Sequence, residues 1–165
     1  MNLKKQVIVI AVALAATICL AWGQDGQSLR AINNQTLQGT WRVTRTAIDC
    51  QTREPLFSFP SIMTFNQGGT YTGYGVAPGI ETPATKSPEY GYWLNSHGPR
   101  TYTIRVLAYT YEPDGTFAGW VEVTSAAQVA IGGNAFTSED TLKVFDADGN
   151  LLFEPCGATT GTRFE

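Results

Sequence analysis

The chain has 165 residues, of which 43% are hydrophobic and only 15% charged, and its formal net charge is −3 at pH 7. A sparsely charged, acidic chain lacks the basic surface that binding to nucleic acid or to an anionic membrane requires. The length suits one domain with a hydrophobic core, and no linker or internal repeat divides it.

The first 23 residues predict a secretory signal peptide. Lys4 and Lys5 form a positive start, Val7–Leu20 is an apolar run, and the small residues Ala21 and Gly23 stand at −3 and −1 of a cleavage site after Gly23. The run is shorter than the roughly 20 residues of a spanning helix. We therefore expect a secreted or periplasmic protein with no stable membrane insertion after cleavage.

Cleavage leaves 142 residues, with nine basic and fourteen acidic side chains because Lys4 and Lys5 are lost from eleven bases. We assign residues 24–36 to an N-terminal extension and residues 37–165 to a β-barrel domain. Asn34 opens an N-glycosylation pattern, which matters only in a host that glycosylates.

Hydrophobic residues of the mature chain alternate with period two, and clusters of Gly, Pro, Asn and Asp interrupt them. Only residues 28–37 have a weak helical pattern. We predict eight strands, at about 38–49, 60–66, 69–75, 89–96, 100–112, 116–131, 134–146 and 150–164. Tight turns between consecutive strands predict an antiparallel up-and-down meander.

The first and last strands are predicted to pair and to close the sheet. In an antiparallel pair the position numbers of facing residues add up to a nearly constant value, which is 204 for Trp41 with Arg163 and 206 for Cys50 with Cys156. Cys19 leaves with the signal peptide, so Cys50 and Cys156 are an even pair in an exported protein and predict a disulfide. Closure also removes the two exposed sheet edges. The fold class is therefore all-β, an eight-stranded antiparallel up-and-down closed barrel.

Gly39-Thr40-Trp41 on the first strand, eight meander strands and Arg163 near the end of the last strand resemble the lipocalins and the wider calycin group. The resemblance implies that Gly39, Trp41 and Arg163 form a structural floor, where the Arg stacks on the indole. The chain has Gly132-Gly133-Asn134 where lipocalins carry Thr-Asp-Tyr, so the resemblance is to calycins broadly.

Chain direction places the connections 50–60, 76–88, 112–116 and 146–150 at the mouth opposite the floor. A closed floor and a looped mouth make a cup, and the resemblance implies that the cup binds a small hydrophobic molecule. With Trp41 inward, period two predicts the following ligand-binding residues in the barrel interior: Val43, Arg45, Met63, Phe65, Tyr71, Trp93, Tyr102, Ile104, Val106, Val121, Val123, Leu142 and Val144. The alternative is that these side chains close-pack and leave no cavity. An inward Arg45 or Arg105 would indicate an anionic group on the ligand.

Catalytic patterns are weak. His97 is the only histidine and lies in a predicted floor turn, and adjacent Glu139 and Asp140 point to opposite faces of a strand. Asp146-x-Asp148-Gly149-Asn150 departs from a calcium loop and predicts a hairpin turn. We therefore predict no catalytic residues, no metal and no cofactor.

The leading functional hypothesis is a carrier or binding protein for a small hydrophobic molecule. The second is a cofactor-free isomerase or cyclase, with Tyr, Arg and Glu122 as its polar groups. The third is a filled barrel that acts as a surface interaction protein through outward aromatics such as Tyr109, Tyr111 and Trp120. Nothing in the sequence predicts an oligomeric state.

Overall fold

The structure of the chain, a computed structural model, describes residues 36–79, 82, 85–96 and 98–164. The predicted signal peptide, all but the last residue of the predicted extension, Asn34 and His97 lie outside the described residues. Within the part that the structure describes there is no helix, and so no helix long and apolar enough to cross a membrane.

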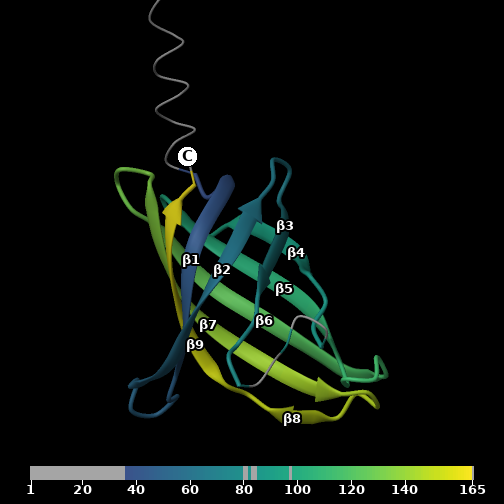
Figure 1. Cartoon of the computed structure of the whole chain (residues 1–165). Helices are drawn as coiled ribbons and strands as arrows, with labels where there is room; N and C mark the ends of the chain where they lie inside the picture. Colours follow the sequence, from purple (N-terminus) through teal and green to yellow (C-terminus); the bar gives the residue numbers. More distant parts are fainter. Residues whose placement is uncertain (1–35, 80–81, 83–84, 97, 165) are drawn as a thin grey trace, which may run out of the picture. The chain divides into compact units, whose positions relative to one another are not determined.

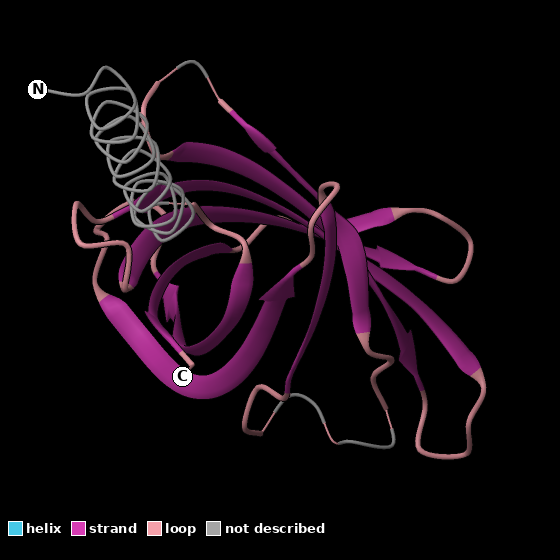
Figure 2. Cartoon of the chain, turned by 90° about the horizontal axis from the view of Figure 1, so that it is seen from above, coloured by secondary structure: helices cyan, strands magenta, loops and turns pink. Residues whose placement is uncertain are grey.

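The described residues form an all-β, antiparallel, closed barrel, which confirms the predicted fold class (Figure 1). Its strands are β1 (Gly39–Ile48), β2 (Pro55–Phe65), β3 (Thr70–Gly75), β4 (Glu89–Asn95), β5 (Thr101–Tyr111), β6 (Phe117–Val129), β7 (Ala135–Asp146), β8 (Leu151–Phe153) and β9 (Cys156–Arg163). The sheet order is β6-β5-β4-β3-β2-β1-β9-β7-β8, and pairing between β6 and β7 closes the cylinder. Eight strands form the wall, which Figure 2 shows curving around a common interior, and β8 is a short addition beside β7.

The register between β1 and β9 follows the sequence arithmetic. Trp41 pairs with Arg163 and Ile48 pairs with Cys156, so the position numbers add up to 204 along the whole ladder. Cys50 stands two residues beyond the partner of Cys156, just past the end of β1, and the two cysteines form a disulfide with their Cα atoms 5.3 Å apart. The predicted disulfide is thus confirmed, and such a bond is typical of an oxidising compartment.

Two predicted strand boundaries are wrong. β2 begins at Pro55 instead of residue 60, because Pro55 already pairs with Ile48 of β1, while β3 pairs with β2 only from Ser61 onward. Before that point β2 has a free edge, and a free edge tolerates Pro55 and Pro60, which lack an N–H group. The predicted strand 150–164 is divided into β8 and β9, since Pro155 has no N–H to continue the ladder.

The core lies at the end of the barrel where β1 begins. Trp41, Phe65 and Phe136 are 0–2% exposed and interlock, with edge-on ring contacts of 5.0 Å between Trp41 and Phe136 and 6.1 Å between Phe65 and Phe136. Gly161 faces this cluster from β9, and a Cβ atom there would collide with the Phe136 ring. A glycine on the inner face therefore leaves the room that the large neighbouring ring fills.

Candidate functional site

The floor of the barrel is sealed around Trp41. The guanidinium of Arg163 lies 4.3 Å over the Trp41 ring, and the Trp41 Nε1 donates a hydrogen bond of 2.8 Å to the Leu37 carbonyl. Arg163 also donates to the Gly133 carbonyl through Nε at 3.1 Å and Nη2 at 2.8 Å. Gly39 has a φ of 123°, and a Cβ there would lie 2.6 Å from Arg163 Nη1. The motif residues thus close one end of the barrel.

Between this floor and the mouth lies a cavity of about 690 Å³, which we call the cup. The volume is typical of sites that bind a small molecule. Its wall includes these residues from the predicted ligand-binding set: Arg45, Met63, Tyr71, Ile104, Val106, Val121, Val123, Leu142 and Val144. The other members lie lower: Val43, Phe65 and Tyr102 are buried in the core cluster, and Trp93 packs against it. A role for any of them in binding stays a prediction.

Near the mouth the wall is apolar but loosely packed. Val121, Val123, Leu142 and Val144 are each only half-buried, although they face inward. Side chains in a filled core are in contact on all sides, so partial exposure of inward aliphatic residues shows that the upper barrel is not filled.

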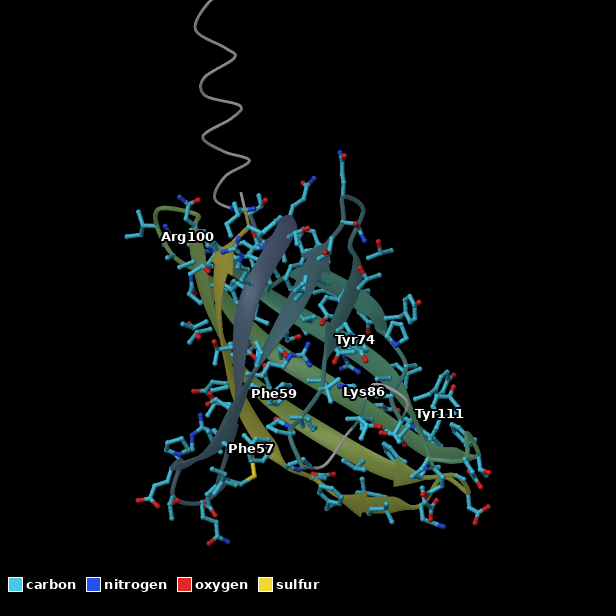
Figure 3. The ribbon with its side chains drawn as sticks, in the orientation of Figure 1. Phe57, Phe59, Tyr74, Lys86, Arg100 and Tyr111 are labelled. Carbon is cyan, nitrogen blue, oxygen red and sulfur yellow. A yellow bond between two sulfur atoms is a disulfide. The ribbon has the colours of Figure 1, made fainter. Side chains whose placement is uncertain are left out.

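Other aromatic side chains line the mouth. Phe57 and Phe59 extend from β2 and Tyr111 from the end of β5 (Figure 3). Figure 3 also places Lys86 nearer the disulfide end of the barrel than Arg100, which lies at the opposite end.

A buried ion-pair cluster stands halfway down the cup. Arg45 on β1 donates from Nη1 and Nη2 to the two carboxylate oxygens of Glu89 on β4, at 2.7 and 2.6 Å. The Tyr71 hydroxyl donates to Glu89 Oε2 at 2.8 Å and accepts from Arg45 Nη2 at 3.1 Å. Lys86 Nζ donates to Glu89 Oε1 at 3.0 Å and to the Gly75 carbonyl at 2.9 Å. The side chains of Arg45, Lys86 and Glu89 are 15%, 6% and 3% exposed.

The opposite charges of this cluster stabilise the ionised forms of Arg45 and Glu89. Burial alone would raise the pKa of Glu89, but the charge and hydrogen bonds of Arg45, with Lys86 and Tyr71, outweigh it and lower that pKa to about 2. Burial likewise disfavours the cation of Arg45, yet Glu89 raises the Arg45 pKa above its ordinary value. Burial and the Glu89 charge raise the pKa of Tyr71 well above its usual range, so its hydroxyl stays protonated.

The adjoining wall carries a second polar group, centred on Asp140 of β7, which is separated from β1 only by β9. Ser138 donates to Asp140 Oδ1 at 2.8 Å, and Thr159 on β9 donates to Asp140 Oδ2 at 2.6 Å. Thr159 is the register partner of Arg45, and Ser125 on β6 is the register partner of Asp140. Polar inward side chains therefore run continuously from β6 through β7 and β9 to β1.

Sequence reasoning missed most of this polar layer, although part of the signal was present. Glu89 is in phase with the inward Trp93, and Asp140 with Leu142 and Val144, so period two already places both carboxylates inside. Lys86 had no such signal because it lies in the long connection before β4, where its backbone forms a single bridge with Thr110.

The remaining polar and aromatic candidates lie elsewhere. Arg105 is exposed, and Glu122 is exposed on the outer face, where it accepts a hydrogen bond from Trp120. Trp120 stacks on Phe145 with ring centroids 4.9 Å apart, and Tyr111 lines the cup. Tyr109 is exposed and pairs with Trp120 across the β5–β6 ladder, and both Tyr109 and Tyr111 contact the ring of Phe117. A surface interaction role for these aromatics therefore stays a prediction.

The acidic residues noted in the sequence have different surroundings. Glu139 faces outward to an exposed ion pair with Arg53 at 3.1 Å, while its neighbour Asp140 faces the cup. Asp146 caps its own hairpin turn, where it accepts hydrogen bonds from the backbone of Asp148 and Asn150. Among the described residues no group of three or more His, Cys, Asp or Glu side chains is arranged to hold a metal ion.

Comparison with known proteins does not assign the chain to a family. No protein-family profile and no curated protein matches the chain. Among solved structures the chain is similar to the crystal structure of Rv2717c from M. tuberculosis, with a TM-score of 0.42 and 15% sequence identity. The match covers 83% of this chain and 97% of that one.

Proposed function

We propose that this chain is an exported, calycin-like binding protein that holds a small, mainly apolar molecule in the cup. The observation that carries the proposal is the cavity of about 690 Å³ between a sealed aromatic floor and an open mouth. Burial of a ligand against this wall contributes about 25 cal/mol for each Å² of apolar surface removed from water. No chemical step is required of such a protein.

The disulfide and the N-terminal sequence support export of the protein. The Cys50–Cys156 disulfide is typical of an oxidising compartment, and the apolar run with two preceding lysines is typical of an export signal. We propose that the mature protein begins after Gly23 and acts outside the cytoplasm, either secreted or in a periplasm.

A direct test is native mass spectrometry of the protein purified from its own source. We expect a co-purifying apolar compound at about one molecule per chain, released on denaturation. A protein that carries no compound and gains none from an extract of small apolar molecules would contradict the proposal.

A pair of matched variants tests whether binding occurs inside the barrel. Val123→Trp puts a large side chain into the cup, whereas Thr124→Trp puts the same side chain on the exposed outer face of β6. We expect the first variant to lose at least tenfold in affinity for a neutral naphthylamine reporter and the second to bind as the unmodified chain does. Equal binding by both variants would place the ligand outside the cup.

The inward polar groups favour one second candidate, a cofactor-free isomerase or cyclase. Arg45 and the Tyr71 hydroxyl face the cup and could polarise a carbonyl, and Asp140 could accept a proton. Incubation of the co-purified compound with fresh protein separates the two candidates, because a binding protein returns the compound unchanged and an enzyme returns an isomer.

A further inference from the structure

A polar belt lines much of the middle of the cup, interrupted on β5 by Ile104, and consists of Arg45, Lys86, Glu89, Ser125, Asp140 and Thr159. Aromatic and aliphatic side chains fill the barrel below this belt, and half-buried aliphatic ones line the cavity above it. A molecule that enters from the mouth therefore passes a mainly apolar wall, with Thr85, Thr110 and Glu112 near the entrance, before its inner end reaches the belt.

The charges of the belt already balance. Arg45 and Lys86 carry two positive charges, and Glu89 and Asp140 carry two negative charges. The net formal charge of the belt is therefore zero. The Asp140 charge also acts on Arg45, which lies two strands away along the wall. An additional buried charge would have no opposite charge left to pair with, and an unpaired buried charge is strongly disfavoured.

The belt nevertheless keeps hydrogen-bonding capacity that its own members do not use. Each Asp140 oxygen accepts one hydrogen bond from a side chain of the described residues, although a carboxylate has about four acceptor positions. Ser125, directly across the β6–β7 ladder from Asp140, makes no side-chain hydrogen bond within the described part of the chain. The Nε of Arg45 is buried and also has no partner there.

We propose that the ligand is amphipathic and that its buried end is an uncharged hydrogen-bonding group, a hydroxyl or a carboxamide. This inference rests on the proposed binding function and refines it. Such a group donates to Asp140 and exchanges a hydrogen bond with Ser125, while it leaves the charge balance of the belt intact. It also revises the sequence expectation that an inward Arg45 indicates an anionic ligand, because Glu89 already neutralises Arg45.

Four compounds with the same dodecyl chain test the inference: dodecanol, dodecanamide, dodecanoate and dodecylammonium. Each is titrated at neutral pH against the protein loaded with the neutral naphthylamine reporter, and displacement gives its affinity. We expect the alcohol and the amide to bind at least tenfold more tightly than the carboxylate and the ammonium ion.

Three variants connect the ranking to the belt. Asp140→Asn leaves a net positive belt, so we expect dodecanoate to gain at least tenfold relative to dodecanol. Ser125→Ala removes only a hydroxyl, and we expect it to weaken dodecanol several-fold while reporter affinity is unchanged. Glu139→Gln removes the neighbouring carboxylate on the outer face and should change neither ranking nor affinity. Melting curves verify that each variant folds.

The outcomes separate this inference from the proposed function. Tightest binding by the carboxylate or the ammonium ion, or equal binding by all four compounds, overturns the uncharged head group but leaves a ligand in the cup. The same holds if both Asp140→Asn and Ser125→Ala fold and keep the original ranking and affinities. If neither the reporter nor any dodecyl compound binds, both the inference and the proposed function fail.

Discussion

The floor and the cup are built on the same strands but differ in how their interiors are filled. Trp41 and Val129 are 0% exposed and Phe136 is 2% exposed, whereas Val123 and Leu142, farther along the same strands or their neighbours, are half-buried. The backbone register is continuous between the two regions. The cavity therefore arises from how the inward side chains pack, because interlocked rings fill one end while half-buried aliphatic residues leave space above them.

This difference implies that the two regions contribute unequally to stability. A ring truncated in the floor leaves a void that its neighbours cannot close, whereas a methyl group removed from the cup only enlarges an existing cavity. The four predictions below test this distinction.

The largest effect is expected for Trp41→Ala, which should lower the free energy of unfolding by about 3–5 kcal/mol. The variant removes the ring that contacts both Phe136 and Arg163. Denaturant unfolding measures the change. Val144→Ala in the cup is the matched control and should cost about 1 kcal/mol or less, because its side chain is only half-buried. Similar losses from the two variants would show that the ends of the barrel are packed alike.

The disulfide is expected to stabilise the loosely packed mouth. It links residues 106 positions apart, so its loss frees a long segment of the unfolded chain. The double variant Cys50→Ser, Cys156→Ser should lose about 2–5 kcal/mol in denaturant unfolding. Labelling of two free thiols in the native, unreduced protein would contradict the bond itself.

The third prediction concerns the ion-pair cluster between floor and cup. The folded pKa of Glu89, about 2, lies below its ordinary value of 4.5, so Glu89 stabilises the fold fully above about pH 4.5. This contribution is lost as the pH falls from 4.5 toward 2, and it amounts to about 3 kcal/mol at neutral pH.

Glu89→Gln should therefore destabilise the protein at pH 7 and flatten this part of its pH–stability curve. Exposed Asp49, Asp114 and Asp146 also have lowered pKa values, but they are common to both proteins and cancel in the comparison. Parallel curves for the two proteins between pH 5 and about 2 would show that Glu89 is not the responsible group.

Period-two alternation and one pair of positions were enough to predict the closed barrel. Trp41 and Arg163 are register partners in the closing ladder. Cys50 lies two residues beyond the register partner of Cys156, which is near enough for the disulfide to form. The boundaries were less predictable, since Pro55 was predicted to lie in a loop although it begins the free-edged part of β2. That edge exists only because β3 is short, which local sequence does not reveal.

The site was predicted less completely than the fold. Alternation places Arg45 and Val123 on the inner face, but it does not say whether inward side chains meet or leave a cavity. The sequence also does not reveal which residue pairs with a buried charge. Arg45 and Glu89 are 44 positions apart in the sequence and come into contact only when the barrel forms. Lys86 reaches the same carboxylate from a connection that has no periodicity.

The smallest predicted effect concerns the cation over the floor. Arg163→Lys keeps the positive charge but loses the planar guanidinium that lies on Trp41 and its paired hydrogen bonds to Gly133, so we expect a loss of about 0.5–2 kcal/mol. Arg42→Lys is the matched control, because Arg42 makes the same kind of contact 4.7 Å from the ring of Phe164, which is 52% exposed. An exposed contact of this kind contributes less, and its loss should fall below about 0.5 kcal/mol. If both variants unfold at the same denaturant concentration, the guanidinium adds nothing to the floor beyond its charge, and the sealing of that end rests on Trp41 and Phe136 alone.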